Sequence, residues 1–474
     1  MITAACKTNP PPNEPRPGGG SHNGASSSKV SSDVHPPPSD PTRPWVLLIV
    51  IDALRADALG IYGATDHATP NLDRLGREGV VFTHAYTAAP FTMTSVASIF
   101  TGLWPWQHKV MFSEDAGLAL SEGLPNMVEA FRQAGYHTAA FSGTYFSLAH
   151  NGFNRGFDLF DESCAPAFFK DSAECLTKRV TDWLASPDAA PGPNFIYIHY
   201  VDTHRPYAPP QEYQKRFTAG LTLPTDKDTA AGEIDQFGSN RKWWQFLRKP
   251  SAVDLKYLRA LYQGEAAYVD DHIVKLLEAI NTNQDHNRSR PLILVTADHG
   301  EAFYEHGIME HVAELHDPVM RVPFILSGAT PHDRVIDDQV RTIDMMPTLL
   351  DLAHIAPPKD IPGRSLVPLL RGEKVDPAPA AAIHFPNGEP EYTLVLYLWK
   401  LFFRPKSNAR ELFRLDDDPG ENHDLAASEP ARLDDMLQQL QALIKLPPPA
   451  SAHPAAPMDP ETIKRLKTLT YIHQ

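Results

Sequence analysis

Two continuous apolar runs, each followed directly by an aspartate, most strongly limit the folds that are open to this chain. Residues Val46 to Ile51 lead into Asp52, and residues Pro291 to Ala297 lead into Asp298 and His299. Runs of this kind are typical of strands that are buried on both faces of a mostly parallel sheet. In open α/β sheets, ligands bind beyond the carboxyl ends of the strands. The sequence therefore predicts candidate metal-binding carboxylates at one edge of such a sheet.

The chain between and after these runs repeats an alternation of strands and helices. We predict further strands at residues 136–142, 195–201 and 322–326, and helices at residues 69–77, 124–135, 172–185, 254–280 and 344–352. This alternation is typical of a doubly wound α/β fold. We therefore predict a mostly parallel central sheet flanked by helices, which forms a catalytic domain over residues 44–382.

The two ends of the chain have a different composition. Residues 1–43 are rich in Pro, Gly, Ser and Asn, and they hold too few large apolar side chains to offset their ordering entropy, so we predict disorder there. Residues 383–446 predict a small C-terminal α+β subdomain, because Tyr392 to Phe403 alternates and Leu433 to Ile444 is amphipathic. Residues 447–474 are a Pro/Ala-rich linker and terminal segment.

Charge and composition exclude several classes of partner. The 474 residues carry a formal net charge of −15, which argues against binding to nucleic acid and against electrostatic adhesion to anionic lipid. No apolar run approaches the length of a transmembrane helix. The three cysteines offer no C-x-x-C pair, and Cys164 and Cys175 either pair in an oxidising compartment or remain separate thiols. The sequence does not indicate an oligomeric state.

The first residues look like the end of a bacterial lipoprotein signal. Thr3-Ala4-Ala5-Cys6 has the pattern of such a cleavage site without the preceding hydrophobic part. If the true start lies upstream of Met1, Cys6 is a candidate lipid anchor, and we expect a periplasmic or cell-surface protein. If Met1 is the true start, the motif is a chance match, and we expect a cytoplasmic protein.

A threonine at a predicted helix start is the candidate nucleophile. After a proline-bounded loop, Val96, Ile99 and Phe100 fall at helical spacing, and Gly102 ends the helix. Thr92 then lies at the N-terminus of this helix, where free N–H groups and the helix dipole favour an anion. The alternative is an ordinary N-cap threonine without any role in chemistry.

These residues together predict a site for an anionic ester. Asp52 and the pair Asp298-His299 suit one divalent cation, such as Ca²⁺, Mn²⁺, Mg²⁺ or Zn²⁺. Coordination to that cation would stabilise the alkoxide of Thr92. Protonated groups such as His204 and His311 would help to neutralise the ester and its transition state. Taken singly, each of these residues is as well explained as a helix cap or a structural histidine.

The chain resembles the sulfatase family of the alkaline phosphatase superfamily from Trp45 to Leu425. The resemblance implies a metal held by Asp52, Asp298 and His299, and Thr92 at the nucleophile position in contact with it. The segments that carry the resemblance are Val50 to Asp57, Thr69 to Leu75, Thr101 to Pro105, Asp202 to Tyr207, Asp298 to Glu301, Glu305 to Gly307, Arg321 to Pro323, Gly363 to Leu366, Glu411 to Leu415 and Asp418 to Glu421.

The same resemblance assigns further residues to the ester. His204 and His311 fall where the family places groups that bind the ester oxygens or assist the leaving group. Thr144 stands near the position where many members have a lysine, so it is a candidate for substrate binding. Ser95 is a second candidate for substrate binding, and the next nucleophile to consider after Thr92.

The chain also departs from the family pattern. Established sulfatases convert the first residue of a Cys/Ser-x-Pro-x-Arg motif to formylglycine, but this chain has Thr92-Met93-Thr94-Ser95-Val96, so we expect no formylglycine. An unmodified threonine resembles the nucleophile of phosphoethanolamine and phosphoglycerol transferases in the same superfamily, which have several transmembrane helices. Ala53 replaces a second aspartate that is common in sulfatases, and this thins the carboxylate shell.

We therefore predict a metal-dependent hydrolase that cleaves a sulfate, phosphate or phosphonate ester of a small molecule, lipid or glycan. Phosphodiester or phosphonate monoester cleavage is favoured, because an alkoxide nucleophile suffices there. One alternative is a transferase that passes a phosphoryl-linked group to a lipid or sugar. Another is a catalytically silent binding protein of the same fold. We expect the long segment from Pro206 to Pro250 to determine specificity.

Overall fold

The computed structural model describes most of the chain. The described residues are 28–29, 43–111, 117, 119–144, 149–165, 172–186, 189, 192–222, 250–283, 290–311, 314–328, 333–385 and 389–452. Residues 223–249, the larger part of the segment that we expect to determine specificity, lie outside this set, and so does Cys6.

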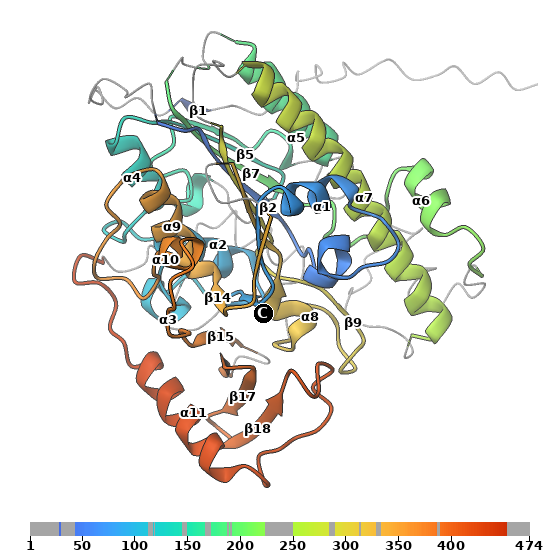
Figure 1. The fold of residues 1–474 in the computed structure, drawn as a ribbon, viewed down its shortest axis with the longest axis vertical. Helices are drawn as coiled ribbons and strands as arrows, with labels where there is room; N and C mark the ends of the chain where they lie inside the picture. The colour runs from blue at the N-terminus through green and yellow to red at the C-terminus, as the bar shows by residue number, and fades with distance from the viewer. Residues whose placement is uncertain are drawn as a thin grey trace, which may run out of the picture.

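A nine-stranded sheet forms the centre of the protein (Figure 1). Its order is β1-β6-β5-β7-β2-β8-β12-β3-β13. The neighbours pair in parallel except for β1 against β6 and for β12, which runs antiparallel to β8 and β3. The expected mostly parallel α/β sheet is therefore confirmed. The strands are β1 (Ser28–Lys29), β2 (Val46–Ile51), β3 (Val80–Phe82), β5 (His137–Ser142), β6 (Leu159–Asp161), β7 (Asn194–Tyr200), β8 (Leu292–Thr296), β12 (Phe324–Ser327) and β13 (Arg334–Ile336).

Helices cover both faces of this sheet. On one face α1 (Pro70–Arg77), α5 (Ser172–Leu184) and α6 (Gln211–Phe217) pack against the long helix α7 (Ala252–Asn283). On the other face α2 (Thr92–Thr101), α4 (Met127–Gln133) and α9 (Met345–Leu352) pack against one another. Every residue of β2, β7 and β8 is consequently buried, as their apolar sequences predict.

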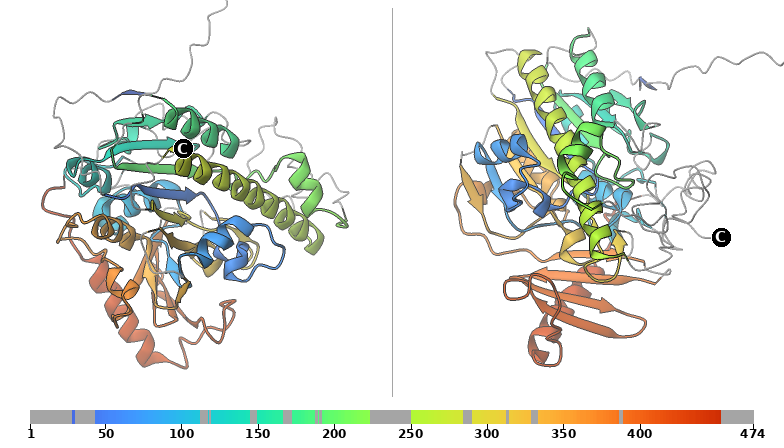
Figure 2. Two further views of the ribbon diagram at one scale, coloured as in Figure 1. Left: turned by 45° about the horizontal axis from the view of Figure 1, so that its top comes forward. Right: turned by 90° about the vertical axis from the view of Figure 1, so that its right-hand side faces the viewer.

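A second, antiparallel sheet lies beside the catalytic domain (Figure 2). It is formed by β15 (Ala380–His384), β16 (Glu391–Leu396), β17 (Trp399–Arg404) and β18 (Ala409–Arg414), and α11 (Pro430–Ile444) packs on β16 and β17. The alternating run from Tyr392 to Phe403 is two strands, because Tyr397 and Leu398 both have positive φ and form a two-residue turn. The expected C-terminal antiparallel sheet is confirmed.

Short elements complete the described part of the fold. They are η1 (Ala56–Ala58), η2 (Gly60–Tyr62), β4 (Ala85–Tyr86), α3 (Pro105–His108), η3 (Ala149–Asn151), β9 (Ala302–Phe303), β10 (Met309–Glu310), α8 (Asp317–Met320), β11 (Arg321–Val322), β14 (Val340–Arg341), η6 (Thr342–Asp344) and α10 (Val367–Leu370).

Two expectations on local structure are wrong in detail. Ser28 and Lys29 lie in the segment for which we predicted disorder, yet they form β1 by main-chain pairing with the edge strand β6. The helix expected from residue 124 begins only at Met127, because the Asn126 side chain caps it by accepting the N–H groups of Val128 and Glu129.

Cys164 and Cys175 form a disulfide, which is one of the two states that the sequence leaves open. It links the loop after β6 to the first turn of α5. No helix in the described part of the chain is long and apolar enough to cross a membrane.

Candidate active site

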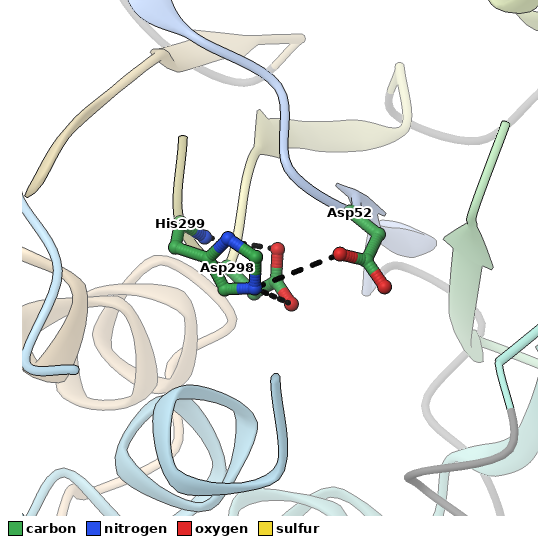
Figure 3. Close-up of side chains that lie close together, drawn as sticks. All are labelled: Asp52, Asp298 and His299. Atoms are coloured by element: carbon green, nitrogen blue, oxygen red, sulfur yellow. Dashed lines mark hydrogen bonds and ion pairs between the residues drawn. The ribbon is translucent and has the colours of Figure 1, made fainter. Parts of the chain in front are cut away.

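The metal-binding candidates meet at the carboxyl ends of two neighbouring strands. β2 pairs in parallel with β8, so Asp52 and the pair Asp298-His299 leave the sheet at the same edge. One ligand atom from each of the three side chains lies within 4.8 Å of the other two. His299 Nε2 is 3.6 Å from Asp52 Oδ1 and 3.5 Å from Asp298 Oδ2 (Figure 3). The structure thus brings together the three residues that the sequence predicts as metal ligands.

The donor atoms of this triad are buried and available. Asp52, Asp298 and His299 are 0 % exposed. Both oxygens of Asp52 and Oδ2 of Asp298 meet no hydrogen-bonding partner in good geometry among the described residues. His299 Nδ1 donates to the carbonyl of Gly300 at 2.9 Å, which leaves the lone pair of Nε2 directed at the carboxylates. Buried oxygens without partners are costly, and a hard or borderline divalent cation would satisfy them. The triad therefore fits such a cation.

Burial and nearby charges shift the pKa values of the two triad carboxylates in opposite directions. Burial raises the pKa of Asp52 well above its usual value, and the nearby charges of Asp298 and Glu301 add to this, while the Thr92 hydroxyl acts against it. Burial also acts to raise the pKa of Asp298, but His299 and His199 bring it below its usual value. Burial lowers the pKa of His299 to about 4. The ring of His299, a candidate metal ligand, is therefore neutral at neutral pH.

Thr92 is the first residue of α2, beside the triad. Its Oγ1 lies 3.4 Å from His299 Nε2, and Phe91, in extended conformation, is the N-cap residue. The side chain of Phe91 makes no capping hydrogen bond to this helix start. The free N–H groups at a helix start favour an anion. Gly102 ends α2 with a positive φ of 67°, as the sequence predicts.

Ser95 lies one turn further along α2 and is bonded to the sheet. Its hydroxyl donates to the main-chain carbonyl of Asp298 at 2.7 Å, and it lies 2.9 Å from the hydroxyl of Thr87. Thr87 also donates to the same carbonyl at 2.6 Å. Thr144 follows β5, and its N–H donates to the Ser142 hydroxyl at 3.3 Å.

Two further histidines lie beside the triad. The ring of His311 stacks on that of His299, with centroids 4.1 Å apart and 28° between the planes. The ring of His204 lies 5.1 Å from that of His311. Burial lowers the pKa of His311 to about 4 and that of His204 to about 3. His204 and His311 are thus placed together next to the candidate metal ligands.

The sequence analysis missed three polar residues around this site. His199 points from β7 with Nε2 4.0 Å from Asp298 Oδ2, and its Nδ1 lies 2.8 Å from the Tyr197 hydroxyl. Glu301 Oε1 lies 3.0 Å from His311 Nδ1, and burial raises the pKa of Glu301 to about 8. Arg55 donates to the Glu301 carbonyl at 2.9 Å. A histidine inside an otherwise apolar strand was the available signal for His199.

A cavity of about 580 Å³ lies between the catalytic domain and the C-terminal sheet. Arg55 and Glu305 line it on one side, and the segment from Pro419 to Glu421 lines it on the other. Among the described residues, its walls include neither the triad nor Thr92. This cavity is therefore separate from the candidate metal site.

Comparisons with known proteins identify the family of the chain. The sulfatase family model matches residues 44–355, and the model of the C-terminal part of N-sulphoglucosamine sulphohydrolase matches residues 304–446. The chain is 26 % identical over 423 residues to the Delta 4,5-hexuronate-2-O-sulfatase of Bacteroides thetaiotaomicron, which covers 81 % of this chain and 85 % of that protein. It is also 26 % identical over 450 residues to the arylsulfatase of Clostridium perfringens, which covers 82 % and 91 %.

A solved structure has a similar fold. The crystal structure of the phosphonate monoester hydrolase of Agrobacterium radiobacter superimposes with a TM-score of 0.68 over 85 % of this chain and 95 % of that one, at 20 % sequence identity. A sulfatase-type domain with an antiparallel C-terminal sheet is the architecture described above. The chain belongs to the sulfatase family of the alkaline phosphatase superfamily, and it is a hydrolase that acts on ester bonds.

Proposed function

We propose that this protein is a metal-dependent hydrolase in which Thr92, unmodified, attacks an anionic ester. The observation that supports this most directly is the meeting of Thr92 Oγ1 with the buried triad, 3.4 Å from His299 Nε2, at the open N-terminus of α2. Such a helix start binds anions through its free N–H groups. The proposed nucleophile, Thr92, therefore lies at the helix start that would bind the anionic ester.

The proposed cofactor is one divalent cation held by Asp52, Asp298 and His299. When bound, a cation of this kind would favour the alkoxide of Thr92 and withdraw charge from the ester oxygens. The sulfatase relatives of this chain support a role for metal, and the unpartnered carboxylate oxygens fit the cation.

In the proposed reaction, Thr92 Oγ1 forms a bond to the phosphorus or sulfur atom while the bond to the leaving alcohol breaks. His204 and His311 lie where they can bind the ester oxygens and pass the proton that Thr92 gives up to the leaving oxygen. Water then hydrolyses the covalent ester on Thr92, which restores the hydroxyl. Without formylglycine, the release of the second product depends on this hydrolysis.

We infer that the ester is a monoanion, such as a phosphodiester, a phosphonate monoester or a sulfate ester. The charges of Asp52 and Asp298 balance one divalent cation, so the charged part of the site is close to neutral. The nearest arginines are engaged elsewhere: Arg55 pairs with Glu305, and Arg205 pairs with Glu310. A phosphate monoester, a dianion, would find little additional positive charge among the described residues. Names of the relatives support both sulfate and phosphonate esters.

We also propose that the protein works in an oxidising compartment, the periplasm or the cell surface. The disulfide between Cys164 and Cys175 supports this, because such bonds persist mainly outside the cytosol.

Turnover of a panel of chromogenic esters tests the proposed function. The panel contains a phosphate monoester, a phosphodiester, a phosphonate monoester and a sulfate ester, each with Ca²⁺, Mn²⁺, Mg²⁺ or Zn²⁺. We expect Thr92→Ala to abolish turnover, and Thr94→Ala, a buried change in the same helix, to retain it. Turnover that survives in Thr92→Ala would move the nucleophile elsewhere. Activity that requires an added acceptor would point to a transferase, and bound ester without turnover would point to a silent binding protein.

A further inference from the structure

A buried carboxylate outside the metal triad contacts the candidate proton donor. Glu301 is 0 % exposed, and its Oε1 lies 3.0 Å from His311 Nδ1. We propose that Glu301 is a positioning residue: it holds the ring of His311 by Nδ1 and leaves Nε2 as the nitrogen that meets the leaving oxygen of the ester. This inference rests on the proposed function, because His311 needs a defined nitrogen only if it serves an ester.

Ring stacking alone does not orient His311. The ring lies against His299 with a centroid distance of 4.1 Å, and its edge meets His204 at 5.1 Å. Turning a stacked imidazole by half a turn about its Cβ–Cγ bond puts Cδ2 in the place of Nδ1 and Cε1 in the place of Nε2, while the ring stays in place. The contact of Nδ1 with Glu301 distinguishes the two orientations. This holds whether the proton between them is on Glu301 or on His311.

Glu301 itself is held from both sides of its backbone. Its N–H donates to the carbonyl of Pro318 at 3.1 Å, and its carbonyl accepts a hydrogen bond from Arg55 at 2.9 Å. The preceding residue, Gly300, is packed so closely that an added Cβ would lie 2.1 Å from the Pro318 oxygen. The Glu301 side chain therefore leaves a fixed point of the chain, as a positioning residue requires.

The residues next to both histidines are joined as well. Glu310 precedes His311, Arg205 follows His204, and the two charged side chains form a partly buried ion pair. This pair ties the loop after β7 to the strand β10. With Glu310, the residue before His311, joined to Arg205 in this way, the freedom that concerns His311 is the orientation of its ring.

The leaving group gives a kinetic test. We would measure kcat and KM of the wild type, Glu301→Ala, Glu301→Gln, His311→Ala and the double variant on para-nitrophenyl and phenyl esters of one acid. General acid catalysis is typically worth ~10²–10⁴-fold, and a poor leaving group needs it most. We expect Glu301→Ala to lower kcat at least 10-fold more on the phenyl ester than on the para-nitrophenyl ester. Glu301→Gln keeps a side chain that can bond Nδ1, so we expect it to restore most of this loss.

The double variant tests whether the two residues act together. We expect Glu301→Ala to add little to the loss caused by His311→Ala, because a positioning residue acts only through its partner. Equal losses on both esters, or losses that multiply in the double variant, would overturn the proposal. The matched control is Glu391→Ala, since Glu391 forms a similar buried contact with His384 at 3.1 Å in the C-terminal sheet. It should affect both esters alike.

A spectroscopic readout does not depend on turnover or on metal. In the metal-free protein with ¹⁵N-labelled histidine, we expect the two ring nitrogens of His311 to show one dominant tautomer in the wild type. We expect a mixture in Glu301→Ala. Identical spectra would overturn the role of Glu301. If Thr92→Ala keeps full activity, the proposed function fails, yet these spectra still decide whether Glu301 sets the state of His311.

Discussion

Replacing Asp52 by Asn should stabilise the metal-free protein and at the same time remove its response to metal. Asp52 is 0 % exposed, its oxygens lack good hydrogen bonds among the described residues, and Asp298 lies on the other side of His299 Nε2. Without a cation, two buried carboxylates face each other at a net cost. The neutral amide removes one charge from this arrangement, so the free energy of unfolding should rise.

The sizes of the two effects follow from the structure. Asn keeps a buried polar group in this place, so the gain comes from removing the charge beside Asp298. A like charge at this distance typically costs about 1–3 kcal/mol, and we expect Asp52→Asn to raise the stability of the metal-free protein by about that amount. A cation at 100 times its Kd stabilises the wild type by about 2.7 kcal/mol. At roughly 2–4 °C per kcal/mol, the wild type should gain several degrees in Tm when metal is added. The variant should gain almost nothing.

The assay is thermal unfolding after treatment with a chelator, with and without each divalent cation, together with the metal content of the protein. The matched control is Asp344→Asn. Asp344 is equally buried, but its carboxylate pairs with Arg341 at 2.6 Å and accepts the N–H of Arg364 at 2.9 Å. This control should lose about 3–5 kcal/mol and keep its response to metal. An equal rise of Tm with metal in Asp52→Asn and the wild type would refute the ligand assignment.

Three further predictions concern stability. Burial lowers the pKa of His108 to about 3, whereas the pKa in the unfolded chain is about 6.5. Protons therefore bind the unfolded chain more strongly below pH 6.5, and stability falls as the pH falls. Between pH 6.5 and pH 5, the free energy of unfolding of the wild type, measured by urea titration, should fall by about 2 kcal/mol more than that of His108→Asn. Cys175→Ser removes the disulfide that closes a loop, so it should cost about 2–4 kcal/mol of stability and lower the Tm measured by calorimetry. Lys400→Met should cost about 3–5 kcal/mol in urea titrations, because it leaves the carboxylates of Asp317 and Glu421 without their buried cation.

Each of these has a result that would contradict it. The pH argument fails if His108→Asn and the wild type lose stability in parallel, with His423→Asn as the control at an exposed histidine. The disulfide argument fails if a reducing agent lowers the Tm of the wild type and of Cys175→Ser equally. The argument on Lys400 fails if Lys406→Met, which removes an exposed ion pair with Glu389, costs as much.

The part of the site that the sequence predicts follows from strand order. Asp52 and Asp298 each end a continuous apolar run, and parallel strands deliver such positions to one edge, so their meeting needs only that β2 and β8 be neighbours. The start of α2 could be placed from local patterns too, because the helical spacing of Val96, Ile99 and Phe100 begins directly after a proline-bounded loop. Local patterns were sufficient for these residues.

The missed residues depend on contacts that no local pattern contains. His199 lies within the apolar run of β7, and only the pairing of β7 with β2 brings it toward Asp298. Glu301 becomes part of the site because His311, ten residues further on, returns to it. The same reason applies to the pairing of β12, whose antiparallel direction is set by its partners and not by its sequence.

The turn of α2 that presents Thr92 shows how such long-range contacts define the site. Ser95 was a candidate for substrate binding, but its hydroxyl bonds the carbonyl of Asp298, and Thr87 bonds the same oxygen. These two bonds fix the first turn of α2 to the end of β8. Because Thr92 and Ser95 are three residues apart, they lie on the same side of the helix. The hydrogen bond from Ser95 to Asp298, a candidate metal ligand, therefore also sets the distance between Thr92 and His299.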